Sequence, residues 1–228
     1  MIMIYRIDEI LNYCKDKKVL HLGYVQHSPK YKKQIDQGTW LHAHISDVAK
    51  EAIGLDILVD AVEDLKTNYN YNGYVGNVEK LESLNLNDKF DVIVAGELIE
   101  HLENPGMFLN GVKRFMRNDS ILIVTTPNAF GQVYQNSYNN TPELEWVNDE
   151  HVTWFSKYTL KRLLERCGYA EKDYGYYFGY ETFESDISTS SPFVRRLKTL
   201  KRKWTYSRLQ KNRQTGLFFV SQLKSNDQ

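Results

Sequence analysis

Apolar residues along the chain fall into two kinds of stretch, which alternate. Short continuous runs that end in glycine or polar residues predict β-strands. The first three such runs lie at 18–23, 52–57 and 73–77. Elsewhere apolar positions recur every three or four residues, which predicts helices. One such helix begins near Ile7, before the first run, and two others span 40–50 and 59–68. This series of strands and helices indicates an α/β fold with a mostly parallel sheet and right-handed crossovers.

The two strongest strand signals lie near the middle of the chain. Residues 91–95 form a continuous apolar and β-branched run, which is typical of a parallel strand covered on both faces. A second run at 120–126 also ends in polar residues. Open α/β sheets bind ligands outside the carboxyl ends of such strands. Chemistry is therefore expected at the residues that follow the first run, namely Gly96, Glu97, Glu100 and His101.

The second half of the chain continues the alternation with one interruption. Residues 105–117 and 158–167 predict helices, and residues 174–180 and 216–223 predict two more strands. Residues 129–150 are rich in Asn, Gln, Tyr and Ser and predict a long loop. Loops of this length in compact domains commonly bind or cover ligands, so we expect a lid-like role.

Length and composition favour a single domain over residues 1–228. The chain is long enough for a sizeable core, and a hydrophobic share of 42% and a charged share of 25% are typical of a globular protein. Two cysteines, Cys14 and Cys167, provide no disulfide framework and favour a reducing compartment. No apolar segment is long enough to span a membrane, and the N-terminus does not resemble a signal peptide. We therefore expect a cytoplasmic location.

The formal net charge of zero conceals an uneven distribution. Residues 192–216 carry nine Lys or Arg and no Asp or Glu, so the rest of the chain has a net charge of minus nine. Residues 192–216 lie largely within an insertion at about 182–215. Within it, the sequence of residues 193–213 predicts a basic amphipathic helix. Its apolar positions are Phe193, Leu197, Leu200 and Trp204. Such a helix can cover its own domain, contact a membrane surface or a lipid-linked substrate, or contact phosphates. Nucleic acid is the least favoured partner.

Three segments resemble the class I S-adenosylmethionine-dependent methyltransferases. Residues 90–105 (FDVIVAGELIEHLENP) and 121–128 (ILIVTTPN) are similar to the fourth and fifth strands of that family. Residues 150–160 are similar to the segment after the fifth strand in a subgroup that methylates small molecules, sugars and lipid-linked precursors. The resemblance spans roughly residues 15–181. It implies a Rossmann-like methyltransferase fold, a seven-stranded sheet with an antiparallel C-terminal strand, and S-adenosylmethionine as cofactor.

The resemblance places the methionine end of the cofactor at the loop after the first strand. The family has a glycine-rich loop here, which lets the backbone approach the ligand. In this chain Gly23 remains, His21 stands where an acid is usual, and Tyr24 and Val25 replace small residues. This departure leaves open a non-catalytic binding or regulatory protein with the same fold.

Four further residues match the family's nucleoside-binding positions. Asp56 ends the second strand and is implied to accept hydrogen bonds from both ribose hydroxyls, although an Asp there is also a common helix cap. Ile57 would pack against adenine. Asn77 stands where the family has an Asp that binds the adenine amino group, and its side-chain oxygen can accept the same bond. Val78 would pack on the adenine ring.

Glu97, Glu100 and His101 share one face if a helical turn begins at Glu97. With His151 they form a set of two carboxylates and two imidazoles that suits a divalent metal ion. The pattern resembles plant small-RNA 2′-O-methyltransferases and some ubiquinone-pathway O-methyltransferases, in which four such side chains hold an ion that binds acceptor hydroxyls. Two alternatives stay open. His101 or His151 acts as a general base while Gly96 and Glu97 line the cofactor pocket, or the cluster is structural.

These features favour a methyltransferase that acts on an oxygen or nitrogen of a small-molecule, glycan or lipid-linked acceptor. The alternatives are the non-catalytic protein described above and an RNA 2′-O-methyltransferase, which the four-residue metal pattern and the basic helix suggest. No motif identifies the acceptor, because the loop at 129–150 and the insertion would determine it. The oligomeric state is also open.

Overall fold

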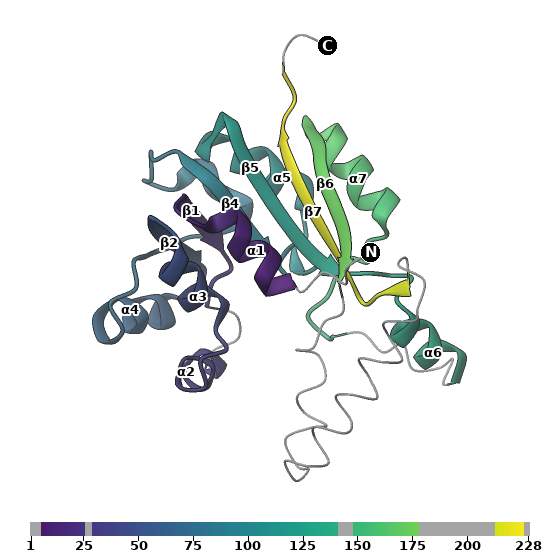
Figure 1. Ribbon diagram of the computed structural model, residues 1–228, viewed down its shortest axis with the longest axis horizontal. Coiled ribbons are helices and arrows are strands. Elements are labelled where there is room, and N and C mark those ends of the chain that lie inside the picture. The colour runs from purple at the N-terminus through teal and green to yellow at the C-terminus, as the bar shows by residue number, and fades with distance from the viewer. Residues whose placement is uncertain (1–5, 26–28, 141–147, 178–212, 226–228) are drawn as a thin grey trace.

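The computed structural model describes residues 6–25, 29–140, 148–177 and 213–225. A seven-stranded sheet forms its centre, and helices cover both faces (Figure 1). The strands are β1 (Lys18–Leu22), β2 (Glu51–Asp56), β3 (Gly73–Val75), β4 (Phe90–Gly96), β5 (Met116–Pro127), β6 (Tyr169–Tyr177) and β7 (Gly216–Leu223). The α-helices are α1 (Arg6–Cys14), α2 (Lys30–Asp36), α3 (Leu41–Val48), α4 (Val59–Asn68), α5 (Pro105–Val112), α6 (Gln132–Asn140) and α7 (Lys157–Arg166). The 3-10 helices are η1 (Val78–Ser83), η2 (Ile99–His101) and η3 (Lys113–Phe115).

The strand order is β3-β2-β1-β4-β5-β7-β6. Neighbours from β3 to β5 pair in parallel, and β7 is antiparallel to both β5 and β6. This confirms the predicted Rossmann-like sheet with an antiparallel C-terminal strand. The chain runs outward from β1 to β2 and β3, then returns to place β4 on the other side of β1. The strand order therefore reverses between β1 and β4, which is where such sheets bind ligands.

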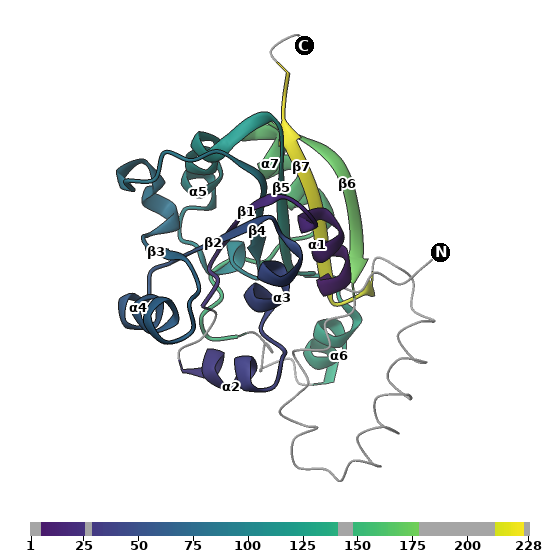
Figure 2. The same ribbon diagram turned by 60° about the vertical axis from the view of Figure 1, so that its left-hand side comes forward.

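Alternate residues of the central strands belong to two different cores, one on each face of the sheet. The core that contains residues of α5 and α7 includes Leu20, Leu22, Ile93, Leu122 and Val124. The core that contains residues of α1 and α3 includes Val19, Val92, Val94, Ile121 and Ile123. Figure 2 shows α1 and α3 together on one side of the sheet, with α5 and α7 on the other side. Burial on both faces explains why these strands are continuous apolar runs.

The ring of Tyr24 is accommodated by glycines in two neighbouring strands. Tyr24 is fully buried and packs in a third core with Trp40, Val62 and other residues of α2, α3 and α4. A Cβ at Gly54 of β2 would collide with the Tyr24 ring, and a Cβ at Gly73 of β3 would collide with its hydroxyl. The large residue in the first loop therefore depends on small residues in β2 and β3.

Three element boundaries differ by several residues from the sequence-based expectation, and one of them is the start of β5 at Met116 rather than at residue 120. The α-helix predicted over 105–117 ends at Val112, because Met116 already pairs with Phe90 in the sheet. Strand β6 begins at Tyr169, earlier than the predicted residue 174. Gly168 has a φ of +79°, so the chain turns directly from α7 into the strand.

The region predicted as a lid-like loop contains helix α6, which covers residues 132–140. Helix α2 was also not predicted, because its short and mostly polar sequence carries a weak apolar pattern. Residues 141–147 and 178–212 lie outside the described residues, and they hold most of the predicted basic helix at 193–213. The lid, the insertion and the single-domain organisation therefore stay predictions. Among the described helices, none is both long and apolar enough to cross a membrane.

Candidate functional site

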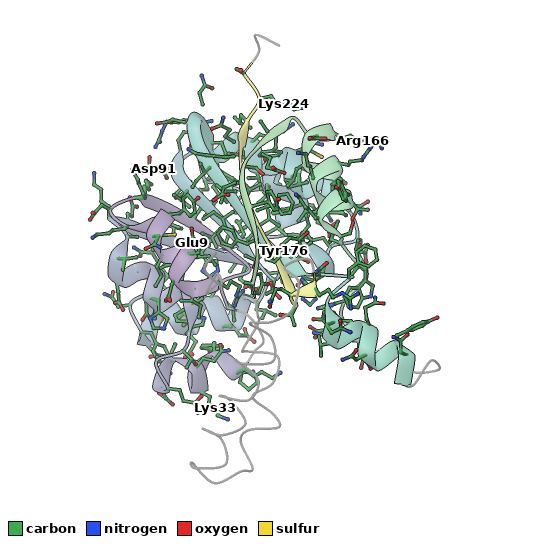
Figure 3. The ribbon with its side chains drawn as sticks, turned by 45° about the vertical axis from the view of Figure 1, so that its right-hand side comes forward. Glu9, Lys33, Asp91, Arg166, Tyr176 and Lys224 are labelled. Atoms are coloured by element: carbon green, nitrogen blue, oxygen red, sulfur yellow. The ribbon has the colours of Figure 1, made fainter. Side chains whose placement is uncertain are left out.

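Gly23 follows β1 and Gly96 ends β4, at the edge where the strand order reverses; the residues before them, Leu22 and Ala95, are paired in the sheet. Gly23 has a φ of +68°, which favours glycine, and a Cβ there would lie 3.0 Å from the Leu98 side chain. Figure 3 labels Asp91 at the opposite end of β4 and Tyr176 near the end of β6. Strand β6 runs parallel to β4, so its last residues lie on the Gly96 side of the sheet.

Two side chains hold the loop that follows β1. The Asp56 carboxylate accepts a hydrogen bond from the backbone N–H of Val25 at 3.0 Å. The indole N–H of Trp40 donates to the carbonyl oxygen of Tyr24 at 2.9 Å. The backbone of this loop is thus held by residues of β2 and the start of α3 rather than by a run of glycines.

Asp56 also organises the start of α4, because its second oxygen accepts a hydrogen bond from the backbone N–H of Leu58 at 3.2 Å. Burial raises the pKa of Asp56, and the backbone donors, Val25 first, oppose that rise. Each carboxylate oxygen can accept a second bond, so ribose binding by Asp56 stays a prediction. Ile57 beside it is 60% exposed, which leaves its side chain able to pack against a planar ligand.

Asn77 and Val78 follow β3 at the edge of the sheet. The side-chain oxygen of Asn77 caps η1 by accepting a hydrogen bond from the Glu79 backbone N–H at 2.8 Å. Asn77 also lines a hollow of about 460 Å³. Val78 is buried in the core, which leaves little of its surface for a ligand. Adenine binding by both residues stays a prediction.

The segment after β4 does not form the predicted helical turn that would align Glu97 with Glu100 and His101. Glu97 has a φ of +51°, and the 3-10 turn η2 begins at Ile99. The N–H of Glu97 donates to the Thr125 carbonyl oxygen at 3.0 Å. Because the turn starts after Glu97, its carboxylate is not part of the cluster that Glu100 and His101 form.

Glu100, His101 and His151 do come together. Each offers one ligand atom, and these atoms lie within 4.8 Å of one another. The two imidazole rings are nearly perpendicular, with centroids 4.6 Å apart. The backbone N–H groups of Val152 and Thr153 donate to the Glu100 carbonyl oxygen at 2.9 and 3.1 Å. These bonds hold the segment that carries His151 against η2.

Glu100 is the buried member of this cluster, and its side chain is 1% exposed. Neither carboxylate oxygen makes a hydrogen bond of good geometry with a described residue. Burial first, and the negative charge of Glu97 second, raise the pKa of Glu100 well above its usual value, and the nearby Thr126 hydroxyl offsets this in part. A divalent cation would supply further opposite charge to this buried carboxylate. The three residues therefore fit such an ion.

Glu97 is held by residues from two other elements. The Tyr177 hydroxyl, at the end of β6, donates to Oε1 of Glu97. A guanidinium nitrogen of Arg6, on α1, lies 3.9 Å from the same oxygen and donates to the Thr125 hydroxyl at 3.4 Å. The Arg6 guanidinium also lies over the Tyr177 ring, 5.9 Å from its centroid. Neither Arg6 nor Tyr177 was identified from the sequence, because both reach the site through tertiary packing.

Two aromatic residues lie beside the cluster. The rings of Tyr134, on α6, and Trp154 are 4.8 Å apart, and the Trp154 ring lies 6.5 Å from that of His151. Burial, with the charges of Glu97 and Glu100, raises the pKa of Tyr134. Helix α6 thus brings an aromatic side chain to the site from the region predicted to be a loop.

Two sequence comparisons bear on this site. The family model described as "Methyltransferase domain" matches residues 36–171, more than half of the chain. A probable S-adenosylmethionine-dependent methyltransferase of Mycolicibacterium smegmatis is 28% identical over 130 residues. That match covers 57% of this chain and 47% of the relative, so it spans about half of the relative's length.

Solved structures show the same fold. A SAM-dependent methyltransferase from Archaeoglobus fulgidus matches with a TM-score of 0.57 and 17% identity, over 95% of this chain and 91% of that chain. The small RNA methyltransferase HEN1 matches with a TM-score of 0.59 and 14% identity, over 98% of this chain and 25% of that chain. The family model covers the segments at 90–105 and 121–128 that resemble this family in sequence. The sheet also has the antiparallel C-terminal strand that the resemblance implies. The chain belongs to the class I S-adenosylmethionine-dependent methyltransferase family.

Proposed function

We propose that the protein transfers a methyl group from S-adenosylmethionine to an oxygen or nitrogen of a small-molecule or glycan acceptor. The observation that carries this proposal is the cluster of Glu100, His101 and His151 beside the carboxyl end of β4. The cofactor supplies a methyl group on a positively charged sulfur. The protein then has to align the nucleophile with that methyl group and accept the nucleophile's proton.

The proposed cofactor contacts lie after successive strands of the sheet. They are Gly23 after β1, Asp56 and Ile57 at the end of β2, Asn77 and Val78 after β3, and Gly96 and Glu97 at the end of β4. The exposed Ile57 side chain next to the buried Asp56 carboxylate supports this arrangement, because it pairs an apolar surface with a hydrogen-bond acceptor. A nucleoside presents both kinds of surface.

The cluster allows two chemistries. If a divalent ion binds, Glu100, His101 and His151 would be its protein ligands, and its chemistry would be to lower the pKa of a coordinated hydroxyl. Without an ion, His101 or His151 would accept the acceptor's proton, since imidazole titrates near neutral pH. The burial of Glu100, whose carboxylate makes no hydrogen bond of good geometry with a described residue, favours the ion. A hydroxyl oxygen is then the favoured nucleophile.

The acceptor side of the proposal rests on a hollow of about 340 Å³ beside α6. Its described lining residues are Phe130, Gln132, Gln135, Asn139 and Arg213. Amide and guanidinium groups bind hydroxyls, and an exposed aromatic ring can lie against a sugar ring. These properties support a glycan-type acceptor.

A lipid-linked acceptor, with a cytoplasmic protein peripheral to the membrane, is a further part of the proposal. It rests on the basic sequence of residues 193–213. We expect the protein to sediment with anionic but not neutral liposomes, and less at high salt, because each Lys or Arg near an anionic surface contributes about 1 kcal/mol. Sedimentation with neither lipid would remove the membrane contact and leave the methyl transfer unaffected.

RNA 2′-O-methylation is the second candidate function. The specific observation in its favour is the same cluster of Glu100, His101 and His151, together with the likeness of the fold to a small RNA methyltransferase. At 14% identity that likeness concerns the fold. Short RNA duplexes offered beside sugars in the acceptor assay distinguish the two candidates.

Calorimetric titration and a transfer assay test the proposal. We expect S-adenosylmethionine and S-adenosylhomocysteine to bind, and methyl transfer to stop in excess chelator and return with added divalent ion. His101→Ala should lose the ion and keep its affinity for S-adenosylhomocysteine. His44→Ala, on α3, is the matched control for loss of an imidazole. Full transfer in chelator would exclude the ion and leave the general base. Cofactor binding without transfer to any acceptor would favour the non-catalytic alternative.

A further inference from the structure

A backbone carbonyl contacts one ring nitrogen of His101. The distance between His101 Nδ1 and the carbonyl oxygen of Glu150 is 3.2 Å. A carbonyl oxygen has no proton to donate, so the ring nitrogen has to be the donor. In a neutral imidazole one nitrogen carries the proton and the other carries a lone pair. The contact therefore places the proton of His101 on Nδ1 and the lone pair on Nε2.

This choice of tautomer matters for both chemistries that the cluster allows, because a metal ligand and a general base both use a nitrogen lone pair. His101 lies in a cluster with Glu100 and His151, and their ligand atoms are within 4.8 Å of one another. Histidines that bind metals commonly donate their other N–H to a carboxylate or a backbone carbonyl, which fixes the tautomer and the orientation of the ring. The Glu150 carbonyl is placed to do this for His101.

The carbonyl belongs to a turn that Asn148 closes. The side-chain oxygen of Asn148 accepts a hydrogen bond from the backbone N–H of Glu150 at 3.1 Å. The backbone carbonyl oxygen of Asn148 accepts another from the N–H of His151 at 2.9 Å. That N–H belongs to the same peptide group whose carbonyl contacts His101. Asn148 therefore holds both this peptide group and the one before it.

The position of the turn separates the orientation of the ring from the packing of the core. Residues 148–150 are exposed, so the Asn148 side chain contributes little to the core. The segment beyond the turn is held separately, because the Glu100 carbonyl oxygen accepts hydrogen bonds from the N–H groups of Val152 and Thr153. Loss of the Asn148 side chain should therefore loosen the turn and leave the attachment of the segment to η2 in place.

We infer that Asn148 is a positioning residue, which fixes His101 through the Glu150 carbonyl in the tautomer that carries its proton on Nδ1. This inference rests on the proposed function, because it assumes that His101 binds the ion or accepts the acceptor's proton. Nε2 is the atom of His101 that performs either task. Asn148 acts through the orientation of the His101 ring and contacts neither the ion nor the acceptor.

NMR of the full nitrogen-labelled chain without added metal measures the tautomer directly. Long-range proton–nitrogen correlations distinguish the protonated ring nitrogen from the unprotonated one, and the signals of His101 are those lost in His101→Ala. At about pH 8.5, where imidazole side chains are ordinarily neutral, we expect the wild type to carry the proton on Nδ1. Asn148→Ala should shift His101 toward the form with the proton on Nε2, which histidine prefers in water. Asn148→Asp keeps an acceptor oxygen and should restore the wild-type tautomer.

Calorimetric titration with Zn²⁺ alone gives a second measurement. Loss of a group that orients a metal ligand typically lowers affinity by about 10–100-fold, so Asn148→Ala should bind Zn²⁺ at least about tenfold more weakly. Asn148→Asp should recover that affinity, and S-adenosylhomocysteine should bind every variant within about twofold of the wild type. Asn110→Ala, on α5, is the matched control, because it removes an exposed Asn that accepts a hydrogen bond from Lys113 at 2.8 Å. It should change neither the tautomer nor the affinity for Zn²⁺.

The tautomer decides the outcome. A wild-type His101 with its proton on Nε2 would overturn the inference, and this measurement needs no variant that might fail to fold. An unchanged tautomer in Asn148→Ala would overturn it as well, even with a lower melting temperature, because the turn would then be purely structural. If the wild type binds no S-adenosylhomocysteine, the proposed function fails, and the tautomer still shows whether Asn148 positions His101.

Discussion

Two buried histidines should make the stability of this protein fall in mild acid. The Nδ1 atoms of His21 and His42 are 3.2 Å apart, and both side chains are fully buried. One ring nitrogen has to donate and the other to accept, so the contact requires at least one neutral ring. Burial lowers the pKa of His42 to about 3. Burial, and then the charges of His42 and Arg6, lower the pKa of His21 well below its usual value.

The size of the effect follows from proton binding. The unfolded chain has ordinary histidines with pKa values of about 6.5, so it binds more protons than the folded chain below that pH, and stability rises with pH. At pH 5.5, one unit below that value, each histidine that stays neutral in the fold costs about 1.4 kcal/mol relative to pH 8. The pair therefore costs about 2.8 kcal/mol between those pH values.

His42→Phe isolates half of this effect. Phe has a similar shape and suits the aromatic surroundings of Trp40 and Tyr71. Urea unfolding at pH 8 and 5.5 should show that the variant loses about 1.4 kcal/mol less stability than the wild type. Ile45→Val, also on α3, is the control, and its cost of about 0.5–1.5 kcal/mol should be the same at both pH values. Equal pH dependence of His42→Phe and wild type would refute the reasoning.

Three other predictions concern the loop after β1 and helix α7. Gly54→Ala should lower the free energy of unfolding by about 1–3 kcal/mol, because the added Cβ would collide with the Tyr24 ring. Tyr24→Leu in the same chain should relieve the collision, so additive losses of the two substitutions in urea unfolding would contradict this. Asp56→Ala removes the acceptor of a loop N–H and a proposed ribose contact, so the affinity for S-adenosylhomocysteine should fall about tenfold or more in calorimetry. Unchanged affinity would exclude the ribose role. Ser156→Ala removes the cap of α7 and should cost about 1 kcal/mol in the same unfolding assay, and no change would show that the cap is dispensable.

The parts of the fold that follow from local pattern were predictable. The apolar runs of β4 and β5 identified buried strands, and the polar residues after them indicated a ligand-binding edge. Helix α6 was not predicted, because six of the residues 132–140 are Gln, Asn or Ser and the apolar pattern is short. Its side chain of Tyr134 still packs on Trp154, a contact that depends on tertiary structure.

The site was predictable in part for the same reason. Glu100, His101 and His151 were found because residue type and spacing suggest metal or base chemistry. The position of Glu97 was not predictable, because a φ of +51° moves this residue out of the turn and no sequence rule indicates that conformation for Glu. Arg6 and Tyr177 reach Glu97 from α1 and β6, and contacts across such sequence distances leave no local signal.

The pairing of β6 with β7 has a consequence for how such proteins diversify. Tyr177 and Gly216 are partners in the sheet, so β6 ends and β7 begins at adjacent backbone positions. The entropy of closing such a connection rises by roughly 0.6 kcal/mol for each doubling of its length. Whole segments can therefore be exchanged there during evolution, or by grafting in the laboratory, without a change in strand register. This junction lies on the same edge of the sheet as the proposed site, so the sequence that joins β6 to β7 can change while the strands that carry the site stay the same.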